Sequence, residues 1–298
     1  MNVYLKALRA PFLAGSLVPV LMGAALALTD EKFSLLFFVV TASGVAALHL
    51  GANLLNDYYD ARGTDQINVR LTPFSGGSRV IQKGEVAARV VLFMALGFFA
   101  LGLATGIWLA SFGRPLVLAI GLLGLSAGWA YSAPPLALMS RGWGEVLIFF
   151  AFGPLVTLGT YYVMCGSLSW PAFALGFPHG LFITGVIWIN QFPDYEADSE
   201  AGKKNLVVRC GPGISRYLYC LIIVLAFVLV IYLVSMEGFS YLIMLSFIAF
   251  PMAFRAMKIL WREYLSFEGV IPAQALTIQF MVAHGLLICL GLLLSRII

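Results

Sequence analysis

Two short segments of this strongly hydrophobic chain combine amides with several carboxylates. The first reads Asn56-Asp57-Tyr58-Tyr59-Asp60, with Asp65 five residues further on, and the second reads Asn190-Gln191-Phe192-Pro193-Asp194, with Asp198 four residues further on. Because residues four apart lie on one face of a helix, each segment can direct an amide and carboxylates toward one point. Oxygen ligands of this kind suit Mg²⁺, which binds few protein groups and shares its remaining positions with phosphate oxygens. The two segments therefore predict a site for Mg²⁺ and a diphosphate, with ligands drawn from Asn56, Asp57, Asp60, Asp65, Asn190, Asp194 and Asp198.

An alternative interpretation is that these acidic residues are solvated helix caps. The helix dipole favours carboxylates at helix N-termini and disfavours them at C-termini. Each segment closes a hydrophobic stretch and so lies at the C-terminal end of a predicted helix. Capping therefore explains the two segments poorly, and the metal interpretation is favoured.

Basic side chains follow each acidic segment closely. Lys and Arg beside a Mg²⁺-bound diphosphate would neutralise the phosphate charge that the metal leaves. Anchoring of the membrane topology is the alternative, because cytoplasmic loops carry an excess of basic residues. Between these cations, Gly76-Gly77 suits either an ordinary turn or a nest of backbone N–H groups for an anion. We predict diphosphate binding by Arg62, Arg70, Arg79, Lys83, Lys203 and Lys204.

A third segment, Tyr131-Ser132-Ala133-Pro134-Pro135, lies between two hydrophobic stretches. Its two prolines end a predicted helix, which places the Tyr131 ring where it could face a cavity. Tyrosine is also common at membrane interfaces, so an interfacial Tyr131 is an open alternative. Arg141 and Glu145 follow, and their spacing of four would allow them to pair with each other.

Histidines and cysteines give no further pattern of this kind. His49, His179 and His284 fall inside hydrophobic stretches, and we predict that each is a hydrogen-bonded packing residue between helices. The cysteines are scattered without the spacing of a zinc or haem motif and are interpreted as packing residues: Cys165, Cys210, Cys220 and Cys289.

Composition fixes the broad class of the protein. Of its 298 residues, 61% are hydrophobic and 11% are charged, and the mean hydropathy is +0.95, far from the values of a soluble domain. A helix needs about 20 apolar residues to cross the hydrocarbon core of a bilayer. We therefore predict an all-α polytopic membrane protein with about nine transmembrane helices, near residues 11–29, 33–55, 90–110, 115–131, 146–164, 172–192, 217–235, 241–259 and 272–294.

The basic residues predict an orientation for these helices. With a cytoplasmic N-terminus, 15 of the 18 Lys and Arg residues fall on the cytoplasmic side and 3 on the other. Both acidic segments then face the cytoplasm, and the C-terminus lies outside. The net charge of +4 follows from this sorting and does not imply nucleic acid binding. No cleavable signal peptide is evident, and we expect an integral protein of the cell inner membrane.

The two acidic segments also suggest an internal duplication. The spacing of Asn56 and Asp60 recurs in Asn190 and Asp194, at the ends of the second and sixth predicted spans. Two four-helix halves plus one extra helix would bring these ends together around a central cavity.

The motifs resemble those of the UbiA superfamily of intramembrane aromatic prenyltransferases. The paired acidic motifs, the segment beginning at Tyr131, and Ala201-Gly202-Lys203-Lys204-Asn205-Leu206 are similar to family segments in the same order, over almost the whole chain. The form of the first motif looks most like the branch that prenylates 1,4-dihydroxy-2-naphthoate in menaquinone biosynthesis. Gln191 and Pro193 depart from the second motif of that branch. The resemblance implies one domain over residues 1–298.

The resemblance also implies a mechanism and its residues. Mg²⁺ and the basic side chains would withdraw electrons from a polyprenyl diphosphate, and an aromatic acceptor would attack the resulting allylic cation inside the bilayer. Asp60, Asp194, Asp198 and Tyr131 are the expected catalytic residues, and Tyr131 and Arg141 are the expected acceptor-binding residues.

Two alternatives stay open from the sequence. One keeps the chemistry and changes the acceptor to another quinone precursor, a chlorophyll-type acceptor or an ether lipid. The other is a transporter of divalent cations or organic anions, because paired acids and repeated halves also occur in transporters. A transporter should carry ionisable residues near the middle of its spans, and here the spans are nearly free of them.

Overall fold

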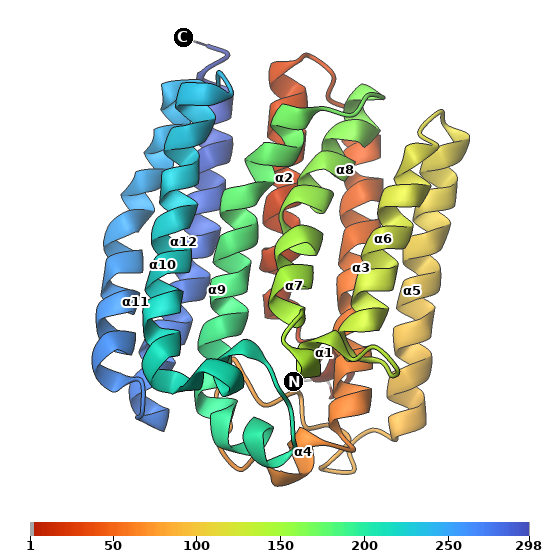
Figure 1. Ribbon diagram of the computed structural model, residues 1–298. Helices are drawn as coiled ribbons and strands as arrows, with labels where there is room; N and C mark the ends of the chain where they lie inside the picture. The colour runs from red at the N-terminus through yellow and green to blue at the C-terminus, as the bar shows by residue number, and fades with distance from the viewer. Residues whose placement is uncertain (1–2, 298) are drawn as a thin grey trace.

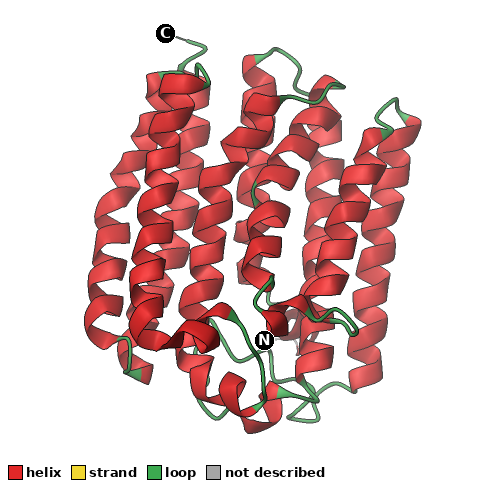
Figure 2. Cartoon of the chain, in the orientation of Figure 1, coloured by secondary structure: helices red, strands yellow, loops and turns green. Residues whose placement is uncertain are grey.

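The computed structural model describes residues 3–297, and within that range every regular element is a helix. Figures 1 and 2 show long helices running side by side, with the loops gathered at the two ends. The helices are α1 (Val3–Leu8), η1 (Ala10–Leu13), α2 (Ala14–Thr29), α3 (Leu35–Asp60), α4 (Thr64–Ile67), α5 (Ala88–Ser111), α6 (Leu116–Ser132), η2 (Leu138–Arg141), α7 (Gly144–Phe152), α8 (Pro154–Cys165), α9 (Trp170–Glu200), α10 (Leu206–Met236), η3 (Tyr241–Ala249), α11 (Phe250–Glu263) and α12 (Phe267–Leu294).

The predicted all-α membrane fold is confirmed, with its count of spans approximate. Within residues 3–297, eight helical stretches are long and apolar enough to cross a membrane. The remaining predicted span, 115–131, is the shorter apolar helix α6 of 17 residues. At 1.5 Å per residue this helix is about 26 Å long, slightly less than the hydrocarbon core.

One membrane-length stretch is broken in its middle, between α7 and α8. Gly153 separates the two helices and Pro154 begins the second. A side chain at Gly153 would place its Cβ only 2.6 Å from the Cα of Gly180 on α9. Glycine is therefore required here because the chain approaches α9 closely. The break lets α7 and α8 line the same cavity from different directions.

Helix α9 lies at the centre of the bundle, and α5 and α11 lie at its edges (Figure 1). The membrane window of α9 is 78% buried, against 22% for α5. Helix α9 packs against α7, α8, α10 and α12, while α12 packs against α11, α9 and α2. The last helix thus connects the second half of the chain to the first. Helix α12 ends at the opposite end of the bundle from α4 (Figure 1).

Aromatic side chains hold α9, α10 and α12 together. Phe182 meets the rings of Phe227 and Phe280 edge to face, with centroids 5.2 Å and 5.3 Å apart. His284 packs on Phe182 at 4.5 Å, and its ring nitrogens have no hydrogen-bond partner within residues 3–297. His179 is the packing residue that was predicted, since its Nε2 lies 2.9 Å from the carbonyl oxygen of Gly15. Its fully buried position joins α9 to α2.

Candidate active site

A cavity of about 320 Å³ opens at the α4 end of the bundle and extends between α2, α3, α6, α7, α8 and α9. Its deeper walls are apolar and include Val45, Leu48, Leu155 and Val156. Its mouth is polar and carries amides, carboxylates and one lysine. The polar residues of the mouth are Asn56, Asp60, Asp65, Asn68, Asn190, Asp194, Asp198, Lys203 and Asn205.

The first acidic motif forms the last turns of α3, which stays helical through Asp60. Asn56 donates from Nδ2 to Asp60 Oδ2 at 2.9 Å and to Ser132 Oγ at 3.3 Å. Its amide oxygen accepts no hydrogen bond within the described chain. Asn56 Oδ1 and the Asp60 carboxylate are therefore oxygen ligands that line the mouth side by side.

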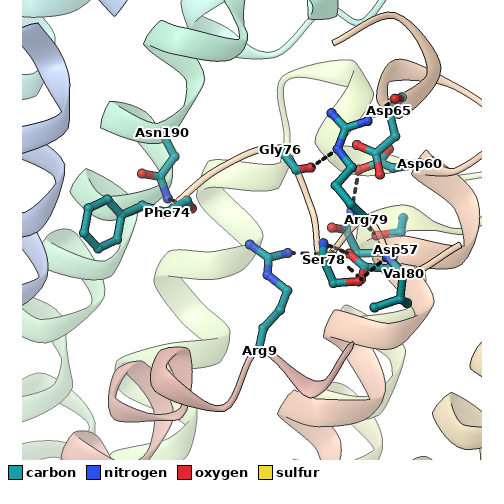
Figure 3. Close-up of polar contacts among 12 residues, drawn as sticks. Arg9, Asp57, Asp60, Asp65, Phe74, Gly76, Ser78, Arg79, Val80 and Asn190 are labelled. Carbon is teal, nitrogen blue, oxygen red and sulfur yellow. Dashed lines mark hydrogen bonds and ion pairs between the residues drawn. The ribbon is translucent and has the colours of Figure 1, made fainter. Parts of the chain in front are cut away.

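Asp57 points away from the cavity. Its side chain is buried, and both carboxylate oxygens lie 3.3 Å from the backbone N–H of Ser78, which donates to them (Figure 3). The guanidinium of Arg9 lies 3.8 Å from the same carboxylate. Asp57 therefore ties the loop after α4 and the chain before α2 to α3. The predicted role of Asp57 as a metal ligand has no support from this position.

Asp65 lies on α4 at the edge of the mouth. Its Oδ2 accepts a hydrogen bond from Gln82 Nε2 at 2.8 Å. Burial, followed by the nearby Asp60 carboxylate, raises the pKa of Asp65 to about 7. A cation bound at the mouth would oppose both effects and favour the charged form of this carboxyl group.

The second acidic motif, at the end of α9, holds the loop that follows α4. Asp194 Oδ1 accepts hydrogen bonds from Asn68 Nδ2 at 2.8 Å and from Ser75 Oγ at 3.3 Å. Asn190 donates to the carbonyl oxygen of Phe74 at 3.1 Å (Figure 3), and its own oxygen accepts from Gln274 Nε2 at 2.9 Å. Asn190 thus positions the loop, and its oxygen keeps a second lone pair beside the hydrogen bond from Gln274.

Lys203 connects the two acidic motifs. Its Nζ lies 3.0 Å from Asp60 Oδ1 and 3.4 Å from Asp198 Oδ1, and Asn205 donates to Asp198 Oδ2 at 2.8 Å. Burial disfavours the charged form of Lys203, but the Asp60 and Asp198 carboxylates outweigh it and raise the pKa of the ammonium. A positive charge therefore lies between the two motifs, where their carboxylates face each other.

The oxygen groups of the mouth fit Mg²⁺ in kind. Among residues 3–297, no three Asp, Glu, His or Cys side chains are grouped closely enough to form a ready-made metal site. Mg²⁺ commonly uses only one or two carboxylates and takes its other ligands from water and substrate phosphates. Asp60, Asp198 and the Asn56 oxygen fit an ion that arrives together with a diphosphate.

Of the six predicted diphosphate-binding cations, Lys203 is the one that lines the cavity. Arg79 is buried and donates to the carbonyl oxygens of Gly76 at 2.7 Å and Asn68 at 2.8 Å, and also to that of Asp65 (Figure 3). It therefore holds the loop in shape. The other four lie outside the cavity: Arg70 pairs with Glu196 at 2.8 Å, Arg62 lies over the Tyr58 ring, and Lys83 and Lys204 are exposed.

Tyr131 lines the cavity, as the sequence predicted for its ring. Arg141 is exposed and donates to the carbonyl oxygen of Pro135 at 2.6 Å, outside the cavity, so its position gives no support to acceptor binding. The open alternative of a pair with Glu145 is not observed either. Glu145 instead accepts hydrogen bonds from Gln191 Nε2 at 2.9 Å and from the N–H of Leu206 at 3.2 Å.

Sequence reasoning missed several residues of the site. Arg9 lines the mouth, although in the sequence it is only one of the 15 basic residues assigned to the cytoplasmic side. Asn68, Ser75 and Asn205 hold the acidic motifs in place, and Gln274 contacts Asn190 from a distant helix. The signal available for Asn205 was its place directly after the Gly-Lys-Lys segment. Nothing in the sequence indicated Gln274.

Fold and site together define a class of protein: a helical membrane protein with an apolar cavity whose mouth presents carboxylates, amides and an ammonium group. The model of the UbiA prenyltransferase family matches residues 16–266. The chain therefore belongs to the UbiA prenyltransferase family and is a prenyltransferase. The predicted family is confirmed, and the transporter alternative is set aside.

Similar proteins include the 1,4-dihydroxy-2-naphthoate octaprenyltransferases of two bacteria. That of Bacillus subtilis (strain 168) is 24% identical over 95% of this chain and 89% of its own length. That of Mycobacterium tuberculosis is 31% identical over 70% of this chain and 69% of its own length. A UbiA homolog from Archaeoglobus fulgidus, solved bound to GPP and Mg²⁺, has the same fold, with a TM-score of 0.61 and 17% identity over 96% of this chain and 99% of that one.

Proposed function

We propose that this protein transfers a polyprenyl group from a polyprenyl diphosphate to 1,4-dihydroxy-2-naphthoate, in a Mg²⁺-dependent step of menaquinone biosynthesis. The observation that carries the proposal is a single cavity with charged and amide groups at its mouth and apolar walls inside. Its shape and polarity match a substrate with an anionic head and a hydrocarbon tail. The names of the bacterial relatives support the aromatic acceptor.

The diphosphate binds at the mouth in this proposal. Lys203 and Arg9 supply positive charge there, and both line the cavity. Mg²⁺, held by Asn56, Asp60 and Asp198, would supply electrophilic activation of the diphosphate oxygens. The lysine ammonium then exchanges carboxylate contacts for phosphate oxygens, which neutralises the departing diphosphate.

The polyprenyl tail extends into the deeper part of the cavity. Gly121 and Gly124 of α6 line this region together with Leu155 and Val156 of α8. An added Cβ at Gly121 would meet no atom within 4 Å, so the wall is open there. Apolar walls also exclude water, which would otherwise capture the allylic cation.

Bond formation takes place between the mouth and these apolar walls. The bond between allylic carbon and diphosphate oxygen breaks, and its electron pair leaves with the diphosphate. A ring carbon of the acceptor forms the new carbon–carbon bond and then releases the proton or the carboxylate that it carried, as H⁺ or CO₂. The electron pair of the broken bond returns to the ring, which restores its aromaticity. Tyr131 and Phe152 line the cavity and provide aromatic surfaces for the cation.

We further propose that residues 1–298 form one domain with its mouth in the cytoplasm, in the cell inner membrane. The support is the distribution of basic residues, of which 15 of 18 fall on the side of the acidic motifs under the predicted topology. The mouth then faces the cytoplasm, which holds the water-soluble naphthoate and receives the released pyrophosphate.

The proposal is tested with purified protein in detergent, Mg²⁺, prenyl diphosphates of several lengths and a panel of acceptors. The panel contains dihydroxynaphthoate, 4-hydroxybenzoate, a chlorophyll-type acceptor and glycerol phosphate lipids, and products are identified by mass. We expect prenylated product from the naphthoate, and only when Mg²⁺ is present. Product from another acceptor alone would overturn the proposed substrate, and a naphthoate product formed at full rate in EDTA would overturn the metal dependence.

A further inference from the structure

A buried polar pair lies on the cavity wall, deeper than the acidic mouth. His49 on α3 and Ser16 on α2 both line the cavity, with His49 9% exposed and Ser16 2% exposed. The Nδ1 atom of His49 lies 2.8 Å from Ser16 Oγ. The ring of His49 also meets that of Phe152 edge to face, with centroids 4.9 Å apart. His49 is a hydrogen-bonded residue between two helices, as the sequence predicts, and it also lines the cavity.

The hydrogen bonds of Ser16 assign the protons of this pair. Ser16 Oγ donates to the carbonyl oxygen of Leu13 at 3.1 Å, and a hydroxyl has a single hydrogen to donate. With that hydrogen directed to Leu13, Ser16 accepts from His49, and we place the imidazole proton on Nδ1. The Nε2 atom carries the lone pair and has no hydrogen-bond partner within residues 3–297. An acceptor nitrogen is therefore available on the cavity side.

An unpaired donor lies one helical turn away. Asn53 follows His49 by four residues on α3 and lines the same cavity. Its Nδ2 is buried and has no partner among the described residues. His49 and Asn53 are about 6 Å apart along the axis of α3 and supply an acceptor and a donor to a space whose other walls are largely apolar. Buried polar groups are normally paired, so the two together indicate a ligand with complementary groups.

The distance of His49 and Asn53 from the proposed diphosphate site suits a flat ring that lies beside the allylic carbon of the donor. His49 precedes Asn56 by seven residues, or about 10 Å along the helix, and both lie on the face of α3 that lines the cavity. The diphosphate is bound at the level of Asn56 in the proposed function. A bicyclic aromatic acceptor would fill the space between His49 and the diphosphate bound near Asn56.

We infer that Ser16, His49 and Asn53 form the binding site for the acceptor ring, in which His49 Nε2 accepts a hydrogen bond from a ring hydroxyl and Asn53 Nδ2 donates to an oxygen of the substituent on the neighbouring ring carbon. The inference rests on the proposed function, and it names the residues that select the acceptor of that reaction. The site takes phenols that carry an oxygen-bearing group, such as a carboxylate, on the ring carbon next to the hydroxyl. The bond to Nε2 strengthens as positive charge spreads from the attacked ring to its hydroxyl, so His49 contributes to turnover as well as to binding.

The test compares a hydroxynaphthoate acceptor with its methyl ether in two proteins, the parent and His49→Phe. The parent should lose at least tenfold in kcat/KM when the hydroxyl is methylated, because Nε2 then faces no donor. In His49→Phe, kcat/KM for the unmethylated acceptor should be at least tenfold lower than in the parent. Methylation of the acceptor should then change kcat/KM by less than threefold. The KM for the prenyl diphosphate should stay within threefold of the parent value, which also shows that the variant is folded.

Ser16→Ala provides a milder second variant. It removes the acceptor that fixes the imidazole proton on Nδ1, and should raise acceptor KM about three- to tenfold with the prenyl KM unchanged. His179→Gln is the matched control, since His179 is a buried histidine that does not line the cavity, and should leave discrimination between phenol and ether at the parent level. The inference would be overturned if the ratio of kcat/KM for the phenol and its methyl ether were the same in the parent and His49→Phe. It would also be overturned if His49→Phe changed only the KM for the prenyl diphosphate. Failure of the parent to prenylate any phenol would instead refute the proposed function.

Discussion

Replacement of Lys203 by methionine should affect stability and catalysis through the same two carboxylates. The side chain keeps its length and apolar stem but loses the ammonium that lies 3.0 Å from Asp60 and 3.4 Å from Asp198. The two carboxylates then face each other without a cation. We expect the metal-free variant to be less stable than the parent and to respond more strongly to Mg²⁺.

The size of the effect follows from burial. The side chains of Lys203, Asp60 and Asp198 are 16%, 17% and 8% exposed, so water screens them little. Removal of one partner from a buried ion pair lowers the free energy of unfolding by roughly 3–5 kcal/mol. Because the three side chains keep some exposure, we expect a loss of about 3 kcal/mol for Lys203→Met. Loss of a positive group from a transferring phosphate typically lowers turnover by about 10²–10³-fold, and we expect that range for kcat.

The assay is thermal unfolding in detergent with and without Mg²⁺, followed by steady-state kinetics. Lys204→Met is the matched control, because Lys204 is the adjacent lysine, is exposed and makes no ion pair within the described chain. The control should behave as the parent in both measurements. If metal-free Lys203→Met melted at the parent temperature, or if both lysine variants lost equal activity, the bridging role of Lys203 would be refuted.

Three further predictions concern the motifs, the cavity and the topology. Asp60→Asn should lower kcat by at least two orders of magnitude at saturating Mg²⁺, whereas Asp57→Asn should mainly lower the melting temperature, because Asp57 lies outside the cavity; equal kinetic losses would contradict this difference. Gly121→Leu should fill the apolar wall and reduce kcat/KM for long prenyl donors at least tenfold more than for geranyl diphosphate, and an equal loss for both donors would contradict the proposed path of the tail. In a cysteine-free background, Gln66→Cys should be labelled only from the cytoplasmic face and Ser295→Cys only from the opposite face, and labelling of both from one side would contradict the topology.

Helical periodicity explains which acidic residues could be predicted and which could not. Each residue of a helix advances about 100° around the axis, so Asn56 and Asp60 lie about 40° apart and share the cavity face. Asp57 lies about 100° from Asn56 and falls outside that face. The same helical periodicity, applied to each residue of the motif, therefore separates Asp57 from Asn56 and Asp60. The membrane-length helices were also predictable, because length and apolarity alone determine them.

The loops were not predictable in the same way. Arg79 and Lys203 are both basic residues that follow an acidic motif, yet one is buried against carbonyl oxygens and the other bridges two carboxylates. The φ angle of Arg79 is 64°, a left-handed conformation that no periodic pattern indicates. Contacts between distant helices, such as Gln274 with Asn190, depend on packing and have no local signal.

The central claim is that the cavity couples cleavage of a prenyl diphosphate to prenylation of an aromatic ring. The most direct measurement quantifies released pyrophosphate and prenylated product in the same reaction, using purified protein, Mg²⁺, a polyprenyl diphosphate and dihydroxynaphthoate. We predict one pyrophosphate for each prenylated product, with little release when the acceptor is omitted. Pyrophosphate released at the same rate without acceptor, or no product from any aromatic acceptor, would contradict the account.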